Sequence, residues 1–547
     1  MEKYKIVVCD HIHEEGLNLL RRDDQVEMIF AADMDKTALL DLIKEADVAI
    51  TRSSTDVDDK FIEAAKGRLK AVVRAGVGVD NVDIPGCSKE GIIVMNVPTA
   101  NTIAAVELTM THMLSCMRMF PYSHDHLKNQ RVWKREKWYG YELKGKKLGV
   151  IGFGNIGSRV GIRSKAFEMD VIAYDPYIHP SKATDVGVKY TTNFEDILAC
   201  DIITIHTPKN KETVGMIGSD EIAKMKDGVV LINCARGGLY DEDALYDGLK
   251  SGKVRFAGID VFNKEPATDH KLLDLDNICV SPHLGANTFE SQLGIALEAA
   301  QQAIEAAKGI AYPHALNLPI DETKIPSFVK PFLEMSQKIG FLASQINKAS
   351  IVSIKVSGRG DIAEYVNSLA TFVTVGALAD ISGDTINYVN ADFVAKERGI
   401  KIETEELPGS PVYKNLVTVK LTTDKDVIEI SATMFNDDVQ RIVDINGFGV
   451  DVEPKGNMIL FKNTDVPGVI GQVGTLLAAH EVNIADFRLG RNKSSEALAV
   501  IIVDSAVNDK TIKELSALNA CISVSYARIY ISLLFSSRYA GIQQSFF

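Results

Sequence analysis

The stretch that decides the fold is KLGVIGFGNIGSRVG, at residues 147–161. Its apolar first half predicts a strand, and the residues after the glycines predict a helix. Between them lies a GxGxxG turn, which in this setting is typical of proteins that bind a dinucleotide. Gly152 permits the tight turn, Gly154 lets the backbone approach a pyrophosphate, and Gly157 lets the helix pack on its strand. We therefore predict a phosphate contact where this helix begins.

Asp175 ends the strand that is predicted next, VIAYD at 171–175. A carboxylate at this place accepts hydrogen bonds from a ribose 2′-hydroxyl and repels a 2′-phosphate. The residue therefore favours NAD over NADP as the cofactor. The alternative is purely structural, because an aspartate that precedes Pro176 is also a common cap of a turn.

Short β-branched strands alternate with helices on both sides of the glycine turn. This alternation predicts parallel sheets with both faces covered. The expected fold class is α/β, with two doubly wound Rossmann-like domains, the first of them discontinuous, then an α+β domain and a ferredoxin-like βαββαβ domain. A helix at 287–308 is expected to return to the first domain. The expected boundaries are 1–97 with 287–317, then 98–286, 318–455, 456–531 and a tail at 532–547.

The composition argues against several classes of protein. The 547 residues include 60 Lys and Arg against 73 Asp and Glu, a net charge of −13, so nucleic-acid binding is not expected. No apolar run approaches the roughly 20 residues that cross a bilayer, so no membrane role is expected. The seven cysteines are scattered without a CxxC pair. They indicate a reducing cytoplasm, with neither a disulfide framework nor a metal site.

Three polar residues follow predicted strands late in the second α/β domain: Arg236, Glu265 and His283. Ligands bind beyond the carboxyl ends of parallel strands, which lie only about 4.8 Å apart, so these side chains can converge. A histidine oriented by a carboxylate suits acid–base chemistry, and an arginine can clamp a carboxylate. The set fits hydride transfer between an alcohol carbon and a nicotinamide. Each residue alone also has a plainer interpretation, as a surface charge, a turn or a solvated histidine.

The chain resembles the D-isomer-specific 2-hydroxyacid dehydrogenase family in motifs that include these three residues. The resemblance extends through residues 318–530, where the chain is similar to the long members that carry a regulatory domain. The matching segments are RAGVGVDNVDI (74–84), VPTANTIAAVEL (97–108), GVIGFGNIGSRV (149–160), LINCARGGLYDEDAL (231–245), AGIDVFNKEP (257–266) and SPHLGANT (281–288).

This resemblance implies that Arg236 and Glu265 are catalytic and that His283 is the acid/base. The substrate domain is then 1–97 with 287–317, and the NAD-binding domain is 98–286. Besides the three glycines, the implied NAD contacts are Asn155, Ile156, Asp175, Thr207, Cys234, Asp260, Gly285 and Ala286. The implied substrate contacts are Arg52, Ser53, Gly76, Val77, Gly78 and Asn101.

Residues 457–530 resemble an ACT domain, on the motifs NTDVPGVIGQVGTLL and VNIADFRLGR. The resemblance implies L-serine as a feedback effector, with Asp465 and Asn483 at its site; alternatively these residues only cap a helix and turn the chain. Residues 318–455 resemble the family's intervening regulatory domain. The segment 133–138 resembles one that lies near the family's dimer contact, and a homodimer or homotetramer is expected. Alternatively, the charged side chains of this segment are only solvated surface charges.

From this resemblance, the expected function is the NAD-dependent oxidation of 3-phospho-D-glycerate to 3-phosphooxypyruvate, the first step of L-serine biosynthesis, in the cytoplasm. Two alternatives stay open. One is a reductase of the same chemistry that acts on glyoxylate or 2-oxoglutarate. The other is a non-enzymatic, NAD-sensing binding protein on the same scaffold. The ACT-like end of the chain weighs against both.

Overall fold

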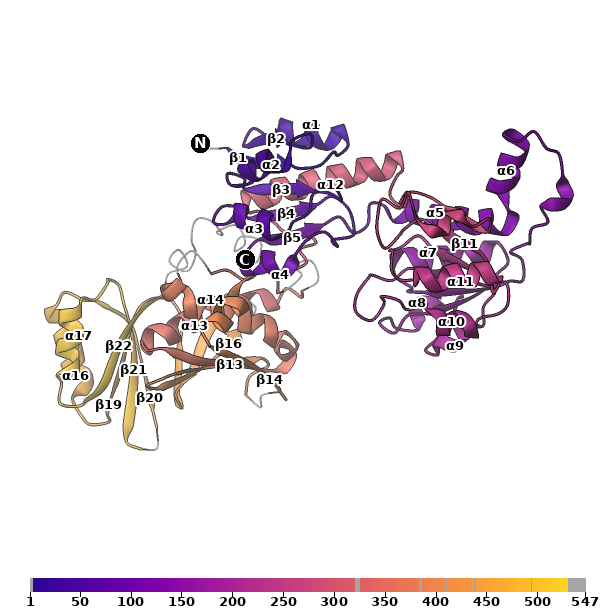
Figure 1. The fold of residues 1–547 in the computed structure, drawn as a ribbon. Coiled ribbons are helices and arrows are strands. Elements are labelled where there is room, and N and C mark those ends of the chain that lie inside the picture. Colours follow the sequence, from indigo (N-terminus) through magenta and orange to yellow (C-terminus); the bar gives the residue numbers. More distant parts are fainter. Residues whose placement is uncertain are drawn as a thin grey trace. The chain divides into compact units, whose positions relative to one another are not determined.

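The computed structural model describes residues 3–319, 325–382, 386–409, 412–436, 439–492 and 494–529 (Figure 1). The expected tail at 532–547 therefore lies outside the described residues. By its internal contacts the chain divides into a first unit, Met1–Asn96 with Glu298–Phe547, and a second unit, Val97–Leu297. The expected division into four domains is finer than this, and it stays a prediction.

The first unit begins with a five-stranded parallel sheet in the order β2-β1-β3-β4-β5. Nearly every residue of β1, β3, β4 and β5 is buried, as expected for strands covered on both faces. The strands are β1 (Tyr4–Val8), β2 (Val26–Phe30), β3 (Val48–Thr51), β4 (Ala71–Arg74) and β5 (Ile93–Asn96). The helices are α1 (Glu14–Arg22), α2 (Lys36–Ile43), α3 (Asp59–Ala65) and α4 (Ile84–Lys89).

The chain returns to this sheet through α12 (Phe289–Lys308), as expected from the sequence. Gln302 donates to the carbonyl of Asn96 at 3.1 Å, and Lys70 donates to the carbonyl of Ala307 at 3.1 Å. Beyond the helix, the Asn317 side chain accepts the N–H of Val94 at 2.9 Å. These bonds make the first domain discontinuous in sequence.

The second unit contains a seven-stranded parallel sheet in the order β12-β11-β10-β9-β6-β7-β8. Successive residues of a strand enter two different cores: Val150 belongs to one and Ile151 to the other. The sheet is thus buried on both faces, and the predicted fold class is confirmed. The strands are β6 (Lys147–Ile151), β7 (Asp170–Tyr174), β8 (Lys189–Thr191), β9 (Ile202–Ile205), β10 (Val229–Asn233), β11 (Val254–Ile259) and β12 (Ile278–Val280). The helices are α5 (Thr102–Arg118), α7 (Asn155–Ala166), α8 (Ser181–Thr184), α9 (Phe194–Leu198), α10 (Ser219–Lys224), α11 (Glu242–Ser251) and the 3-10 turn η2 (Lys271–Asp274).

The segment after α5 contains two short helical elements. It forms α6 (Phe120–Lys128) and the short 3-10 turn η1 (Arg135–Lys137), which extend from the rest of the second unit in Figure 1. Met119 separates α5 from α6 because it adopts a left-handed conformation, with φ 51°, and Pro121 lies in the first turn of α6. A proline in that position is a signal for the start of a helix.

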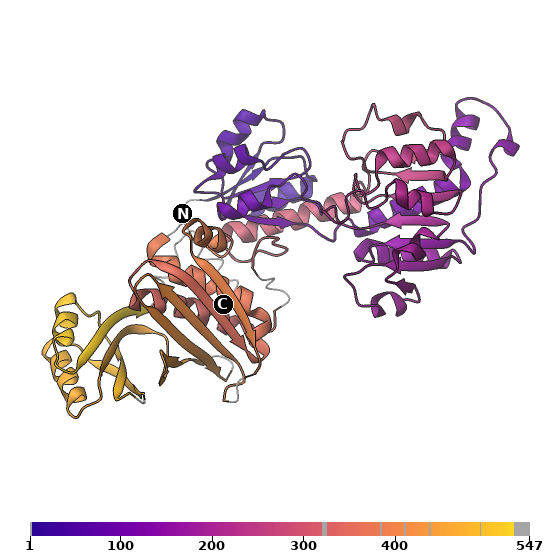
Figure 2. The ribbon, with the colours of Figure 1, turned by 60° about the horizontal axis from the view of Figure 1, so that its bottom comes forward.

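The middle of the chain forms a six-stranded sheet in the order β14-β13-β15-β16-β17-β18, with α13 and α14 packed on one face (Figure 2). Only β13 and β14 pair in parallel. The strands are β13 (Ile351–Arg359), β14 (Lys401–Leu407), β15 (Leu416–Thr423), β16 (Val427–Phe435), β17 (Val439–Ile445) and β18 (Phe448–Val452). The helical elements are α13 (Val329–Ile346), η3 (Gly360–Tyr365), α14 (Val366–Ser382) and α15 (Ala391–Glu397).

The two long helices of this domain approach each other closely at two glycines. A Cβ atom on Gly340 of α13 would lie 2.1 Å from the carbonyl oxygen of Val373, and one on Gly376 of α14 would lie 2.0 Å from that of Gln337. The stretch Gly360–Ile381 is long and apolar enough to cross a membrane by length and composition alone. Since 78% of its 18-residue apolar window is buried inside the structure, the stretch has the character of a core helix.

The described C-terminal part is a βαββαβ domain whose antiparallel sheet has the order β20-β21-β19-β22. Both helices lie on one face of the sheet (Figure 1), where Val473 and Leu515 pack with Phe461 and Ile501 in one core. The elements are β19 (Gly456–Thr464), α16 (Val469–Ala479), β20 (Ile484–Arg491), β21 (Glu496–Val503), α17 (Asp509–Ser516) and β22 (Cys521–Ile529). This is the ferredoxin-like order that the sequence predicted.

The close helix contact leads to a prediction for stability. We expect Gly340→Ala to lower the free energy of unfolding by about 1–3 kcal/mol, because the added methyl group meets a backbone carbonyl that cannot move alone. Gly449→Ala is the control; it lies on β18 of the sheet on which α13 packs, and a Cβ there has no other atom within 4 Å. Calorimetric melting of the full chain measures both variants; equal melting temperatures would contradict the prediction.

Candidate active site

The glycine turn of the second unit has the geometry of a phosphate cradle. Gly152 has φ 82°, and a Cβ atom there would lie 2.7 Å from the carbonyl oxygen of His206. A Cβ on Gly157 would lie 2.0 Å from the carbonyl oxygen of Gly152, so the third glycine closes the turn on the first. A Cβ on Gly154, by contrast, would have no other atom within 4 Å, so this glycine leaves open space before α7. That space, at the start of a helix, suits an anion.

Asp175 directly follows β7 and connects the glycine turn to the next strand. One carboxylate oxygen accepts the N–H of Phe153 at 2.8 Å, and the other accepts the N–H of Tyr177 at 3.0 Å. The second bond is the turn cap that the sequence offered as the alternative. The contact with a ribose stays a prediction for Asp175.

Two of the predicted site residues, Thr207 and Asn101, each have a buried polar side-chain atom that lacks a partner among the described residues. The hydroxyl oxygen of Thr207, directly after the half-buried His206, has no hydrogen bond among the described residues. The same holds for Oδ1 of Asn101, which begins α5. Burial lowers the pKa of His206 to about 3, so its ring is neutral. Because buried polar atoms normally have partners, Thr207 and Asn101 fit a site that receives a polar ligand.

His283 and Glu265 lie together, as the sequence predicted. The Nδ1 atom of His283 is 2.7 Å from a carboxylate oxygen of Glu265, and the other oxygen accepts the N–H of Phe262 at 3.0 Å. Burial raises the pKa of Glu265, but the hydrogen bonds from His283 and Phe262 outweigh it and hold this pKa below its usual value. The carboxylate is therefore charged and fixes the imidazole tautomer with the proton on Nδ1.

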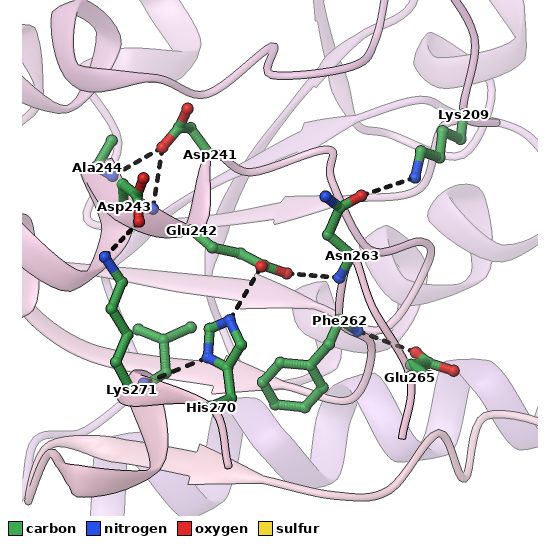
Figure 3. A network of polar contacts seen from close by, with 11 residues as sticks. Lys209, Asp241, Glu242, Asp243, Ala244, Phe262, Asn263, Glu265, His270 and Lys271 are labelled. Carbon is green, nitrogen blue, oxygen red and sulfur yellow. Dashed lines mark hydrogen bonds and ion pairs between the residues drawn. The ribbon is translucent and has the colours of Figure 1, made fainter. Parts of the chain in front are cut away.

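The loop that carries Glu265 is held by a network of polar contacts (Figure 3). Glu242, in the first turn of α11, accepts the N–H of Asn263 at 2.6 Å and contacts Nε2 of His270 at 3.0 Å. Lys209 donates to the Asn263 side chain at 3.0 Å. The carboxylate of Glu265 is thus positioned from two sides of its own loop.

His283 lies in a loop that is bonded to a second buried carboxylate, that of Asp260. The backbone of His283 is left-handed, with φ 54°, and its N–H donates to the carbonyl of Asp260 at 2.8 Å. The Asp260 side chain accepts the N–H groups of Leu284 at 2.7 Å and Gly285 at 3.0 Å. Asp260 has no exposed surface. The implied contact of Asp260 with NAD stays a prediction, and in the structure its carboxylate organises the His283 loop.

Arg236 follows β10, where Asn233 shapes its backbone. The Asn233 side chain donates to the carbonyl of Arg236 at 2.9 Å and accepts the N–H of Ala235 at 3.0 Å. The charge of Arg236 also helps to lower the pKa of Glu265. The other predicted NAD contacts surround this edge: Asn155 and Ile156 begin α7, Cys234 is buried after β10, and Ala286 accepts a hydrogen bond from Gln292.

Most of the predicted substrate residues belong to the first unit. The N–H of Arg52 donates to the buried Asp10, and its guanidinium donates to the carbonyl of His11 at 3.1 Å. Ser53 is exposed beside it. The side chain of Asn96 donates to the carbonyl of Val77 at 2.8 Å and so fixes the turn at 76–78.

The sequence analysis missed one cation at this turn, that of Arg74. Gly76 has φ 149°, and a Cβ there would lie 1.8 Å from a guanidinium nitrogen of Arg74. The glycine therefore makes room for the arginine, which lies over the backbone turn. Arg74 opens the matching segment RAGVG, so its signal was present in the sequence.

The ACT-like domain contains a cavity of about 390 Å³ at the start of α16. Asp465 lines this cavity and pairs with Arg491 at 3.1 Å. Asn483, the second predicted effector residue, is not among the lining residues and donates to Asp504 at 2.6 Å. The structure thus brings Asp465 to a cavity, together with an arginine that the sequence analysis did not select.

The fold of the second unit, together with the glycine turn and the polar side chains at the carboxyl end of its sheet, defines a dehydrogenase that uses a dinucleotide cofactor. Residues 110–285 match the model of the D-isomer-specific 2-hydroxyacid dehydrogenase NAD-binding domain. Residues 328–446 match the D-3-phosphoglycerate dehydrogenase intervening domain, and residues 457–520 match the ACT domain. The cofactor is NAD, which fits the open space at Gly154 and the unpartnered Thr207 hydroxyl.

Similar proteins cover nearly the whole chain, and solved structures cover more than half of it. D-3-phosphoglycerate dehydrogenase of Bacillus subtilis is 38% identical over 95% of this chain and 99% of its own. That of Archaeoglobus fulgidus is 37% identical over 96% and 100%. Among solved structures, a glyoxylate reductase from Paecilomyes thermophila is 28% identical with a TM-score of 0.52, covering 56% of this chain and 96% of its own. A D-lactate dehydrogenase from Aquifex aeolicus, complexed with NAD and lactic acid, is 29% identical with a TM-score of 0.50, covering 56% and 96%. The chain belongs to the D-isomer-specific 2-hydroxyacid dehydrogenases, in the long form with an intervening and an ACT domain.

The different surroundings of two glycines give a prediction for cofactor binding. We expect Gly154→Ala to keep the melting temperature but to raise the NADH dissociation constant at least about tenfold, about 1.4 kcal/mol, because its methyl group occupies the open space. Gly157→Ala is the contrasting variant and should lower the free energy of unfolding by about 1–3 kcal/mol. Fluorescence titration and calorimetry measure the two quantities; wild-type NADH affinity in Gly154→Ala would remove that glycine from the site.

Proposed function

We propose that this chain oxidises 3-phospho-D-glycerate to 3-phosphooxypyruvate with NAD, the first step of L-serine biosynthesis. The observation that carries the proposal is the 2.7 Å contact between His283 and Glu265, at the carboxyl end of the same parallel sheet whose β6 leads into the dinucleotide turn. The names of the full-length relatives support the choice of substrate. They do not favour a glyoxylate or 2-oxoglutarate reductase or a non-enzymatic binder.

The geometry of the pair assigns the proton. With Nδ1–H donated to Glu265, the lone pair of Nε2 is free to take the proton of the substrate hydroxyl. The Glu265 carboxylate stabilises the imidazolium that results. When bound, NAD accepts the hydride from the carbinol carbon. Arg236 is assigned to polarising the oxygen that becomes the carbonyl.

The acidic groups of the substrate are assigned to cations and N–H groups. In the first unit, Arg52 and Arg74 neutralise negative charge, and the turn at 76–78 offers backbone N–H groups to a carboxylate. Asn101 of the second unit offers its buried, unpartnered side-chain oxygen as an acceptor. We keep Ser53 in this set because it lies next to Arg52.

Replacing the pair tests the mechanism. We expect His283→Ala to lower kcat by about 10²–10⁴ with the affinity for NADH kept, because the general base is lost. Glu265→Gln should also lower kcat, since an amide stabilises an imidazolium poorly. The measurement is NADH formation with 3-phosphoglycerate, glycerate and lactate. Equal rates on the three acids would reject the substrate, and wild-type turnover in His283→Ala would reject the base.

We further propose that the cavity of the ACT domain binds L-serine as a feedback inhibitor. The cavity is lined by one negative side chain, Asp465, and one positive side chain, Arg491. A zwitterionic amino acid matches both, because its ammonium group can pair with Asp465 and its carboxylate can bind Arg491 and the N–H groups at the start of α16. We keep Asn483 as a second contact, although it bonds Asp504 in the structure.

Serine titration of the activity tests this regulation. We expect Asp465→Ala to raise the serine concentration for half-inhibition at least about tenfold, because the partner of the ammonium group is removed. Asp509→Ala, in the first turn of α17 and away from the cavity lining, is the control. A wild-type enzyme that is unaffected by serine at high millimolar concentration would reject the effector.

We also propose a homodimer or homotetramer in the cytoplasm, with the domain limits expected from the sequence. Exposed aromatic side chains on the segment around α6 support a contact between two copies: Phe120, Trp133 and Tyr139 are 63%, 76% and 78% exposed. Seven free cysteines support a reducing compartment.

A further inference from the structure

A chain of buried polar contacts leads from α5 to the loop that carries His283. Nε2 of His112, on α5, lies 2.7 Å from the hydroxyl oxygen of Ser281. That hydroxyl donates to a carboxylate oxygen of Asp260 at 2.6 Å. His112 is 3% exposed, Asp260 is fully buried and Ser281 between them is partly buried, so water has little access to these bonds.

The direction of the hydrogen bonds follows from counting protons. The Asp260 carboxylate accepts two backbone N–H groups besides the Ser281 hydroxyl, which is the behaviour of an ionised acid. The single hydroxyl proton of Ser281 is used by Asp260. Nε2 of His112 is therefore protonated and donates a hydrogen bond to the Ser281 oxygen, whereas Nδ1 is not protonated.

The surroundings of the ring agree with a neutral histidine. Nδ1 of His112 has no hydrogen-bond partner among the described residues. Burial lowers the pKa of His112, although the charge of Asp260 raises it. A Cβ on Gly258 would lie 2.9 Å from Cβ of His112 and 3.2 Å from its Nδ1, so the ring fits only because residue 258 is a glycine.

The end of this chain of contacts is the His283 backbone. Asp260 receives the N–H of His283 at its carbonyl and the N–H groups of Leu284 and Gly285 at its carboxylate. His283 itself has a left-handed backbone, which a histidine adopts only where its surroundings determine it. The direction in which the ring faces a substrate thus depends on how Asp260 is held.

We propose that His112 is a positioning residue for the proton-transfer step. By donating to Ser281, it fixes the rotamer of that serine, orients the Asp260 carboxylate and sets the loop 281–285 so that His283 meets Glu265. A purely structural role explains the residue poorly, because a buried imidazole with an unpartnered nitrogen costs stability that an apolar side chain does not.

The first test compares two replacements of His112 in the full-length enzyme. His112→Met fills the volume but removes the donor, and His112→Gln keeps an N–H donor at similar reach. We expect His112→Met to lower kcat by about 10- to 100-fold, as a small misplacement of a catalytic group does, with the NADH dissociation constant within about twofold of wild type. His112→Gln should recover most of the lost rate. Met113→Leu, on the same helix, controls for altered packing.

A second readout separates positioning from a loss of folded protein. With substrate deuterated at the carbinol carbon, we expect the isotope effect on kcat to increase in His112→Met, because the chemical step becomes slower than product release. A variant that only unfolds in part keeps the wild-type isotope effect and loses amplitude. An unchanged isotope effect, or no recovery in His112→Gln, would overturn the proposal.

Ser281 supplies the matching half of the test. Ser281→Ala should lower kcat as His112→Met does, and the double variant should be little worse than either single one, because both remove the same link. Additive losses would overturn the link. The choice of substrate rests on the proposed function, so each variant is assayed with the 2-hydroxy acid that the wild type oxidises fastest. If the wild-type enzyme is inactive on 3-phosphoglycerate, the proposed function is rejected. The proposal for His112 is tested only by comparing the variants with the wild type.

Discussion

The burial of one carboxylate governs the chemistry of the second unit. Asp260 directly follows β11, the strand next to the edge strand β12, and has no exposed surface. A charge in such a place is stable only when its oxygens are fully hydrogen-bonded. The donors come from the loop after the neighbouring strand, at Ser281, Leu284 and Gly285. The need to satisfy Asp260 therefore folds that loop tightly and forces the backbone of His283 into a conformation that aims its side chain at Glu265.

The two carboxylates of this edge have different tasks because their surroundings differ. Asp260 is sealed and bonded mainly to backbone N–H groups, so it acts as an anchor. Glu265 is only partly buried and keeps one oxygen for the backbone and the other for His283. Glu265 can therefore stabilise a positive charge that forms on the His283 imidazole. Asp260 cannot change its hydrogen bonds in this way without disrupting the loop that it holds.

The sequence carried much of this in local signals. The glycines at 152, 154 and 157 predicted the turn. In the structure a side chain at 152 or 157 would clash with the backbone, whereas the position at 154 borders open space. The contact between His283 and Glu265 was predicted from strand ends alone, while the catalytic roles of both stay predictions. Arg74 was missed although it precedes the glycine turn, and α6 was missed although Pro121 marks its start. His112 had no local signal, because it is one of several polar residues in its helix, and only the tertiary structure shows what it touches.

The glycine at 258 and the imidazole at 112 share one volume, although they stand far apart in the sequence. Evolution cannot then alter them independently. A descendant of this gene that gained a methyl group at 258 would have to shrink its partner on α5 in the same lineage, and a relative with a larger residue at 258 should have lost the imidazole. Covariation of these two columns among homologous sequences is the historical trace that such a shared volume leaves behind.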